Sequence, residues 1–414
     1  MKVLVVNAGS SSLKYQFIET VTGEVYAKGI CERIGIEGSL IDHRNLIKDT
    51  RNKTEQPMQD HSDAMKLVVG ALTDKTYGCI DDMREIEAVG HRVVHGGAFF
   101  TESIRLTPEV LEKLKLCRDF APLHTDAHIM GIMGCLVTMP DTPQVLVFDT
   151  AFHQTMEPEA FIYALPYEYY EKYSIRRYGA HGTSHRNVSS EMAKLLDKPL
   201  SETKIVTCHI GNGSSISAVC GGKVIDTSMG FTPLEGLEMG TRCGSIDPAI
   251  VPYIMEKENL SAAQVNDLMN KKSGFLGISG FSSDARDLDA AIAEGPGGPK
   301  YFRAKLALDI LKHQIKKYIG SYAALMNGLD AVVFTAGLGE NNKYLREKVL
   351  EDMEYLGIEL DRERNSNLNR PAGPEKISKD TSRVQAYVIP TNEELVIAKD
   401  TAAIVCNKCC ANTK

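Results

Sequence analysis

Two segments of this chain repeat one pattern about half a chain length apart, and this repeat limits the possible fold more than any other feature. Residues 3–17 read VLVVNAGSSSLKYQF, and residues 205–219 read IVTCHIGNGSSISAV. In each, an apolar strand enters a turn of Gly, Asn and Ser, and a second β-rich run leaves it. The repeat predicts two related domains, each opening with a polar hairpin turn. Such turns offer many N–H and hydroxyl donors to a polyphosphate, so we expect two facing hairpins to form a nucleotide cleft.

The composition is that of an ordinary globular protein, and it limits the kinds of partner that the protein can bind. Of 414 residues, 43% are hydrophobic and 24% charged, which is enough for sizeable cores and two or three domains. The net charge of −7 argues against nucleic acid as the main partner. No apolar run reaches bilayer length, so we expect no membrane segment. Ten cysteines without a secretion signal fit a reducing cytoplasm.

Metal-binding patterns in the sequence are weak. The tail carries one CxxC pair, with no second pair to complete a zinc site; its cysteines are Cys406, Cys409 and Cys410. Three histidine pairs have i, i+4 spacing, namely His91–His95, His124–His128 and His181–His185. None carries the Glu of an HExxH motif, and only the pair at 124 and 128 is expected on a helix. We therefore favour other roles than zinc binding for these residues.

Strand and helix patterns alternate in both halves and predict mixed sheets flanked by helices. In the first half, we expect a hairpin at 2–19, strands at 25–31, 88–94 and 144–148, and helices at 63–73, 108–119 and 124–137, with a polar stretch at 35–60. In the second half, we expect strands at 204–210, 215–220, 223–228 and 330–337, and helices at 248–256, 261–270, 303–325, 342–356 and 391–405. Capping-box spacing occurs at Ser261/Gln264 and at Thr391/Glu394.

The known phosphate-binding motifs are largely missing from the chain. It has no GxxxxGK[ST] loop, no HRD or DFG set and no GxGxxG, so it is neither a P-loop enzyme nor a protein kinase. The duplicated hairpins instead resemble those of the actin, sugar-kinase and heat-shock chaperone ATPase superfamily. This resemblance implies an α/β fold in which two ribonuclease-H-like domains clamp ATP between them.

Nine motifs also resemble, in order, those of the acetate kinase family. They are 7–14 (NAGSSSLK), 90–97 (GHRVVHGG), 121–126 (APLHTD), 148–153 (FDTAFH), 177–185 (RYGAHGTSH), 209–215 (HIGNGSS), 239–248 (MGTRCGSIDP), 337–341 (GLGEN) and 391–394 (TNEE). On these motifs, which cover roughly residues 1–403, the chain is identified as a member of that family. The resemblance implies one domain at 1–149 plus 391–406 and a second at 150–390 that carries most of the nucleotide site.

The implied reaction is ATP + acetate ⇌ ADP + acetyl phosphate, by direct in-line displacement in a cytoplasmic homodimer that supports acetyl-CoA biosynthesis. The carboxylate nucleophile is already ionised, so the difficulty is repulsion between two anions, and fixed cations and donors must supply most of the catalysis. By resemblance, Arg92 holds the substrate carboxylate, while Arg242 and His181 stabilise the transferring phosphoryl group. Asp149 matches the family's active-site carboxylate; orienting Arg242 and holding metal-bound water are both open roles for it.

The remaining site residues also follow from the resemblance. His124 supports the substrate site, and the acyl pocket is lined by Val94, Leu123, Pro233 and the residue before His181. Asn7 and Glu393 match the site for Mg²⁺ (or Mn²⁺). The residues implied for ATP/ADP are Ser12, Lys14, His209, Ile210, Gly211, Asn212, Gly213, Asp284, Ala285, Arg286, Gly337, Leu338, Gly339, Glu340 and Asn341.

One residue departs from the family pattern. Position 180 is Ala, where the family commonly has Phe, and the smaller side chain leaves room beside the methyl group of acetate. Each added CH₂ gains about 0.8 kcal/mol on burial, so we expect a flatter preference between acetate and propionate. The alternatives are a short-chain carboxylate kinase, a sugar-type kinase and a nucleotide-gated binding module. A sugar kinase needs a base but no arginine beside its neutral acceptor, and only about ten residues follow the last helix, too few for a peptide-binding domain.

Overall fold

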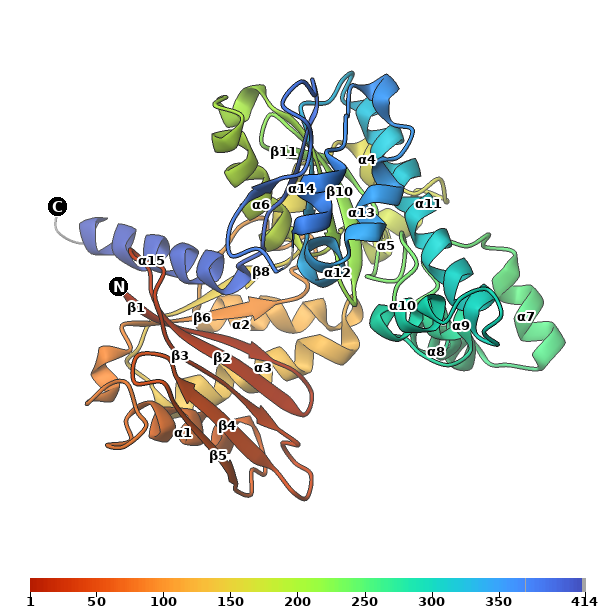
Figure 1. Ribbon diagram of the computed structural model, residues 1–414. Coiled ribbons are helices and arrows are strands. Elements are labelled where there is room, and N and C mark those ends of the chain that lie inside the picture. Colours follow the sequence, from red (N-terminus) through yellow and green to blue (C-terminus); the bar gives the residue numbers. More distant parts are fainter. Residues whose placement is uncertain (369, 412–414) are drawn as a thin grey trace. The chain divides into compact units, whose positions relative to one another are not determined.

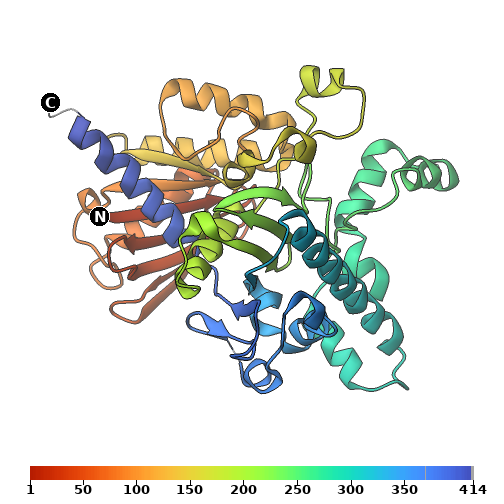
Figure 2. The same cartoon turned by 90° about the horizontal axis from the view of Figure 1, so that it is seen from above.

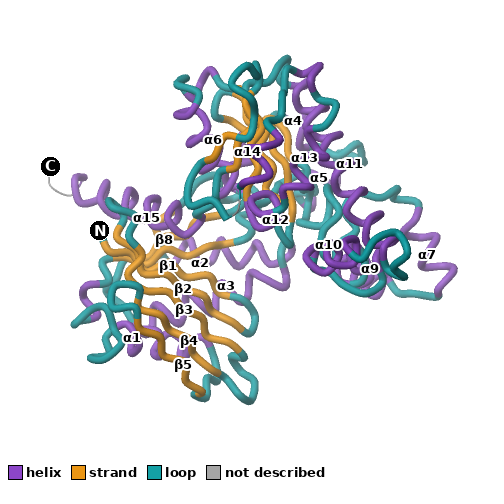
Figure 3. The backbone as a smooth tube through the Cα atoms, viewed as in Figure 1, coloured by secondary structure: helices purple, strands orange, loops and turns teal. Residues whose placement is uncertain are grey.

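The computed structural model describes residues 1–368 and 370–411, and these form two compact units (Figure 1). Unit 1 is Met1–Phe152 with Asn392–Lys414, and unit 2 is His153–Thr391. Each unit holds one mixed sheet flanked by helices, as predicted (Figure 3). Within the described ranges, no helix is both long and apolar enough to cross a membrane.

The sheet of unit 1 has eight strands in the order β5-β4-β3-β2-β1-β6-β8-β7. The strands are β1 (Lys2–Ala8), β2 (Ser12–Glu19), β3 (Val25–Glu32), β4 (Leu40–Asn45), β5 (Thr50–Glu55), β6 (Ala88–Val93), β7 (Ile104–Arg105) and β8 (Gln144–Phe148). β1 pairs antiparallel with β2 and parallel with β6, which in turn pairs parallel with β8. The carboxyl ends of β1, β6 and β8 therefore meet at one edge of the sheet.

Side chains alternate across β1 and create two apolar faces. Leu4 and Val6 pack against α1 (His61–Leu72) and α3 (Pro122–Thr138). Val3 and Val5 pack against α15 (Glu393–Ala411), so the last helix lies beside the first strand (Figures 1 and 2). Gly90 of β6 allows this close approach, because a Cβ there would lie 2.5 Å from Thr401 Oγ1.

The sheet of unit 2 has six strands in the order β11-β10-β9-β12-β14-β13. They are β9 (Lys204–Ile210), β10 (Ser214–Cys220), β11 (Lys223–Thr227), β12 (Ala331–Thr335), β13 (Glu375–Lys376) and β14 (Gln385–Val388). Val206 and Cys208 of β9 join the core beneath the long helix α11 (Tyr301–Leu325). The alternate residues Ile205, Thr207 and His209 point to the other face, which α6 (Gly182–Leu195) covers.

The other helices are α2 (Pro108–Lys115), α4 (Pro158–Phe161), α5 (Glu168–Tyr173), α7 (Ile250–Glu258), α8 (Ala262–Lys271), α9 (Gly274–Ser279), α10 (Ala285–Ala293), α12 (Ala336–Asn341), α13 (Lys343–Leu350) and α14 (Arg362–Asn367). Short 3₁₀ turns lie at Met83–Glu85, Leu116–Asp119, Ala151–Thr155, Leu200–Glu202 and Glu354–Leu356.

Several local expectations need correction. The polar stretch at 35–60 forms the hairpin β4–β5. The helix expected at 342–356 ends at Leu350, and the Gly-rich turn before it is itself the short helix α12. The capping box of Ser261 and Gln264 is confirmed. The second one is wrong, because Asn392 rather than Thr391 caps α15, accepting the Leu395 N–H at 3.1 Å.

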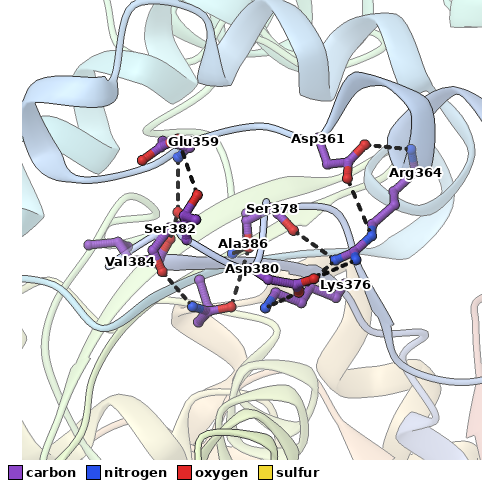
Figure 4. Close-up of polar contacts among 11 residues, drawn as sticks. Glu359, Asp361, Arg364, Lys376, Ser378, Asp380, Ser382, Val384 and Ala386 are labelled. Atoms are coloured by element: carbon purple, nitrogen blue, oxygen red, sulfur yellow. Dashed lines mark hydrogen bonds and ion pairs between the residues drawn. The ribbon is translucent and has the colours of Figure 1, made fainter.

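Hydroxyl and ionic contacts hold the segment that leads into β14 (Figure 4). The Ser382 hydroxyl accepts the Glu359 N–H at 2.9 Å and donates to the Val384 carbonyl at 2.6 Å. Arg364 pairs with Asp380 at 2.9 Å, but both side chains are exposed, so this ion pair contributes about 1 kcal/mol or less. The buried hydroxyl contacts therefore do more to place β14, which pairs with β12 and leads to Thr391.

Candidate active site

In unit 1, a buried ion pair joins the ends of two parallel strands. Arg92 lies near the end of β6, and Asp149 directly follows β8. The strand register continues past β8, since the Asp149 N–H donates to the Val93 carbonyl at 2.9 Å. Arg92 Nη2 then lies 2.8 Å from Asp149 Oδ2, and Nε lies 3.3 and 3.2 Å from the two carboxylate oxygens. The carboxylate of Asp149 is 2% exposed and orients the guanidinium of Arg92.

Glu393, the first residue of α15, completes this charged cluster. Its carboxylate lies 3.5 Å from Arg92 Nη2. Burial raises the pKa of Glu393 to about 7; the Arg92 charge opposes this shift, and the carboxylates of Asp149 and Glu394 add to it. The Asp149 charge in turn raises the pKa of Arg92, so the guanidinium stays ionised. A further cation near Glu393 would favour its ionised form.

The first hairpin turn runs from Gly9 to Ser12, whose carbonyl accepts the Gly9 N–H at 2.7 Å. Asn7 and Lys14 face each other across the strands that enter and leave this turn. Both line a cavity of about 500 Å³, together with Glu394. The structure thus brings together an amide, an ammonium group and a carboxylate from the two ends of the chain.

The predicted substrate residues of unit 1 lie around the end of β6. The Val94 N–H donates to Nε2 of the buried His128 at 3.2 Å. Burial lowers the pKa of His128 to about 3, so this ring is a neutral acceptor. His124 is exposed in the first turn of α3, and its ring stacks on that of His128, with centroids 6.3 Å apart. The side chain of Leu123 lies outside the described residues.

In unit 2, His181 is the N-cap residue directly before α6 and has a left-handed conformation, with φ of 59°. Its Nδ1 lies 2.8 Å from the Ser215 hydroxyl, which also contacts His185 Nε2 at 2.7 Å. The ring of His181 stacks on that of His209, with centroids 4.1 Å apart and planes inclined by 18°. A helix start and the turn-side ends of β9 and β10 therefore fix the orientation of His181.

His181 and Arg242 converge on Gly213. A Cβ on this glycine would lie 3.3 Å from His181 Nε2 and 3.6 Å from Arg242 Nη1. The guanidinium is anchored by a 3.2 Å bond from Nη1 to the Pro233 carbonyl, and burial lowers its pKa. Within the part of the chain that the structure describes, Arg242 forms no ion pair with a carboxylate. Its charge is therefore available to an anion.

The turn between β9 and β10 packs against two other predicted segments. It follows Ile210 and closes with a 3.1 Å bond from the Gly211 N–H to the Gly213 carbonyl. A Cβ on Gly240 would lie 2.5 Å from Asn212 Oδ1, so the loop that carries Arg242 lies against the turn. A Cβ on Gly211 would lie 3.6 Å from the Cβ of Ala336, the first residue of α12.

The acidic residues that were predicted to contact nucleotide mainly form hydrogen bonds and ion pairs within the protein. The carboxylate of Glu340 accepts the Ala336 N–H at 2.8 Å and the Thr391 N–H at 3.1 Å. It thus fixes α12, which carries Gly337, Leu338, Gly339 and Asn341. Asp284 caps α10, which begins at Ala285, and pairs with the exposed Arg286. Among the described residues, neither Asp284 nor Arg286 forms a hydrogen bond or ion pair with α12. A bond of 2.8 Å from the Asn342 amide to the Asp289 carboxylate links α10 to the start of α13.

The sequence interpretation missed three polar residues that support the histidines. Thr207 binds His185, and Ser184 joins His209 Nδ1 (2.8 Å) to the Thr391 hydroxyl (2.9 Å). Ser184 and Ser215 lie within two of the family motifs, but no role was predicted for either of them. A signal was present, because polar residues recur at alternate positions of the apolar strands β9 and β10. Among the described residues, no cluster of three or more His, Cys, Asp or Glu side chains could hold a metal ion. Cys409 and Cys410 have side chains outside those residues.

Comparisons with known proteins converge on one family. The sequence model of the acetokinase family matches residues 2–399. Acetate kinase of Thermoanaerobacter pseudethanolicus is 56% identical over 406 residues, which cover 98% of this chain and 99% of the relative. Acetate kinase of Methanosarcina thermophila is 54% identical over 406 residues, with 98% and 97% coverage. The crystal structure of Porphyromonas gingivalis acetate kinase superposes with a TM-score of 0.93 at 46% identity (98% and 99% coverage). A propionate kinase from Francisella tularensis gives 0.88 at 40% identity (97% and 99% coverage).

Proposed function

The chain belongs to the acetokinase family, and we propose that it reversibly transfers the γ-phosphoryl group of ATP to acetate, giving acetyl phosphate and ADP. The family match over nearly the whole chain is the observation that carries the proposal. The residues at the motif positions suit the chemistry, because two arginines and a histidine are arranged where their donors can meet anions. A carboxylate acceptor needs such cations, whereas a neutral sugar hydroxyl does not.

We propose that Arg92 holds the acetate carboxylate. Its planar guanidinium can donate two parallel bonds to a carboxylate. Asp149 already occupies Nε and one face of Nη2, and it thereby limits the directions in which Arg92 can receive substrate. On this basis Asp149 acts as a positioning residue for Arg92. The two roles left open for it from the sequence stay predictions. Val94, Leu123 and His124 are the proposed neighbours of the substrate.

His181 and Arg242 are the proposed donors to the transferring phosphoryl group. Charge spreads over its equatorial oxygens in the transition state, and fixed donors at hydrogen-bond distance stabilise that charge. Gly213 supports this assignment, because its missing side chain leaves the space on which both donors converge. The Gly211–Gly213 turn, Ser12, Lys14, His209, and the segments 284–286 and 337–341 are the proposed contacts of ATP and ADP.

Magnesium belongs to the same proposal. Asn7 and Glu393 would hold it, and its chemistry there would be to neutralise charge on the β- and γ-phosphate oxygens. The donor set fits, because amide and carboxylate oxygens are the ligands that this cation prefers. A carboxyl group with a pKa of about 7 would also be fully ionised by a neighbouring cation.

The acyl range is the one point on which a second activity is favoured. Ala180 is buried against Met229 and Met239, so flexible methionine side chains border the space that a phenylalanine would occupy. We propose that propionate is accepted more readily than in relatives with Phe at this position. The propionate kinase among the similar structures is compatible with such a range. We further propose that the enzyme works as a homodimer in the cytoplasm.

The direct test incubates the protein with ATP, Mg²⁺, acetate and hydroxylamine. Acetyl phosphate is trapped as acetohydroxamate, which forms a coloured complex with ferric iron and which an ATPase or a sugar kinase does not produce. We expect trapping to require all of these components and to fall at least about 100-fold in Arg92→Ala and Arg242→Ala. Absence of hydroxamate with wild-type protein would refute the proposed function. Near-normal turnover of both folded variants would refute the roles given to the arginines.

A further inference from the structure

A continuous chain of short hydrogen bonds leads from a buried threonine to His181. The Thr207 hydroxyl contacts His185 Nδ1 at 2.7 Å. The other nitrogen of His185 contacts the Ser215 hydroxyl at 2.7 Å, and that hydroxyl contacts His181 Nδ1 at 2.8 Å. Thr207, His185 and Ser215 are completely buried, whereas His181 is partly buried. Three residues that do not line the phosphoryl position are thus linked to the one that does.

The direction of these bonds follows from counting protons. Burial lowers the pKa of His185 far below its usual value, so its ring is neutral, with one N–H donor and one acceptor. The Thr207 hydroxyl also lies 3.4 Å from the Ser217 carbonyl, which can only accept. If Thr207 donates to this carbonyl, its oxygen accepts from His185 Nδ1–H. His185 Nε2 then accepts a hydrogen bond from the Ser215 hydroxyl, and the Ser215 oxygen accepts a hydrogen bond from His181 Nδ1–H.

The opposite direction satisfies one bond fewer. With Thr207 donating to His185 Nδ1, no hydroxyl proton remains for the Ser217 carbonyl, which lies opposite Thr207 in the β9–β10 pairing. His185 Nε2–H would donate to Ser215, and Ser215 would donate to His181 Nδ1. Buried polar groups are hydrogen-bonded in the great majority of proteins, and networks favour the arrangement that satisfies most members.

We propose that Thr207, His185 and Ser215 are positioning residues that keep a proton on Nδ1 of His181, so that Nε2 donates to the phosphoryl group only when His181 is an imidazolium cation. The inference rests on the proposed function for the role of His181. It adds that this side chain contributes a positive charge as well as a hydrogen bond. The proton stays on His181 throughout, and no bond to it is made or broken in the transfer.

The groups that face His181 oppose its charge before the anion arrives. His185 lies on its own helix, His209 of β9 stacks on its ring, and Arg242 reaches the same side of Gly213. His153 lies further along, its ring 5.7 Å from that of His185. The guanidinium of Arg242 disfavours a second positive charge nearby, whereas a phosphoryl group favours one. We therefore expect His181 to gain its second proton most readily in the nucleotide complex.

The first test is the tautomer of neutral His181 in the full-length, ligand-free protein. Long-range ¹H–¹⁵N correlation spectra of ¹⁵N-histidine-labelled protein distinguish Nδ1–H from Nε2–H rings, and His181→Asn identifies the signal. We expect Nδ1–H in the wild type at high pH. In Thr207→Val, His185 Nδ1 loses its acceptor, so the chain reverses and His181 becomes Nε2–H. Thr207→Ser keeps the hydroxyl and the wild-type tautomer. An Nε2–H ring in the wild type would overturn the proposal.

The second test is the pH dependence of turnover at saturating substrates. Wild type and Thr207→Ser should lose rate about ten-fold per pH unit above the titration of His181. Thr207→Val should show a flat profile there, because its neutral His181 still donates from Nε2. Identical profiles in Thr207→Val and Thr207→Ser would refute the proposal. Should Thr207→Val not fold, Ser215→Ala must give a mixture of His181 tautomers, and a pure wild-type tautomer there counts against the chain. A wild type that yields no hydroxamate refutes the proposed function, while the tautomer measurement still decides the inference.

Discussion

Gly213 offers the sharpest test of the phosphoryl site, because one methyl group should block chemistry while leaving the fold intact. In Gly213→Ala, the new Cβ lies 3.3 Å from His181 Nε2 and 3.6 Å from Arg242 Nη1. Phosphoryl oxygens must approach these donors to about 3 Å, so the methyl occupies their position. The backbone of Gly213 is not in the left-handed region, so alanine fits without strain.

The expected magnitude follows from this displacement. Moving the reacting group by about 1 Å lowers the rate by on the order of 100-fold, or about 2.7 kcal/mol of transition-state stabilisation. Only side-chain ends must shift by a few tenths of an ångström to admit the methyl, so we expect less than about 1 kcal/mol change in the free energy of unfolding. The predicted variant is therefore folded and almost inactive.

Steady-state hydroxamate kinetics and urea unfolding measure the two effects separately. Gly70→Ala is the matched control, because a Cβ there has no neighbour within 4 Å and Gly70 lies in α1 of unit 1. This control should keep the wild-type kcat, and its free energy of unfolding should rise by up to about 1 kcal/mol from helix propensity. A kcat for Gly213→Ala within about three-fold of wild type would show that His181 and Arg242 do not act at this position.

Three further predictions concern other sites. Glu238 is 2% exposed, and burial raises its pKa to about 8. Among the residues that the structure describes, neither of its carboxylate oxygens has a hydrogen-bond partner. Its stability contribution is lost as pH rises from the unfolded value toward 8, so Glu238→Met should stabilise at pH 9 by roughly 3 kcal/mol and far less at pH 5, which urea unfolding at both pH values measures. Asp149→Asn removes the charge that orients Arg92, so the KM for acetate should rise at least about ten-fold; an unchanged KM in a folded variant would argue against this positioning. Ala180→Phe should lower the kcat/KM for propionate relative to that for acetate. An unchanged ratio of the two kcat/KM values would contradict the acyl-pocket assignment.

The elements that were predicted well are those whose pattern is local. The apolar strands of both hairpins and the long helix α11 carry their own periodicity, and the mixed α/β class that this periodicity predicts is confirmed. The family was inferred from the resemblance of nine motifs and is also confirmed. The hairpin β4–β5 was missed because its exposed face carries charged residues such as Arg44 and Arg51, which mask the alternation. The helix α6 was missed because it starts at a left-handed His181 without a capping side chain.

The sequence predicted which residues belong to the site, but it could not predict which of them contact each other. The pairing of Arg92 with Asp149 depends on β6 and β8 being neighbours, which a sequence separation of more than fifty residues does not reveal. Thr391 was expected to cap α15, but its hydroxyl binds Ser184, because Asn392 is one residue nearer to the helix. The proposed roles of the individual site residues and the predicted domain ranges stay predictions.

The packing of the last helix against the first strand has a consequence for biosynthesis. Val3, Val5 and Val147 are synthesised before unit 2, yet the residues that cover them, Ile397 and Ala398, are synthesised after it. Unit 2 can complete its core while this apolar face is still open to chaperones or to other nascent chains. Truncations within α15 therefore act first on the folding of the N-terminal sheet, and Glu393 reaches Arg92 only after unit 2 has been synthesised.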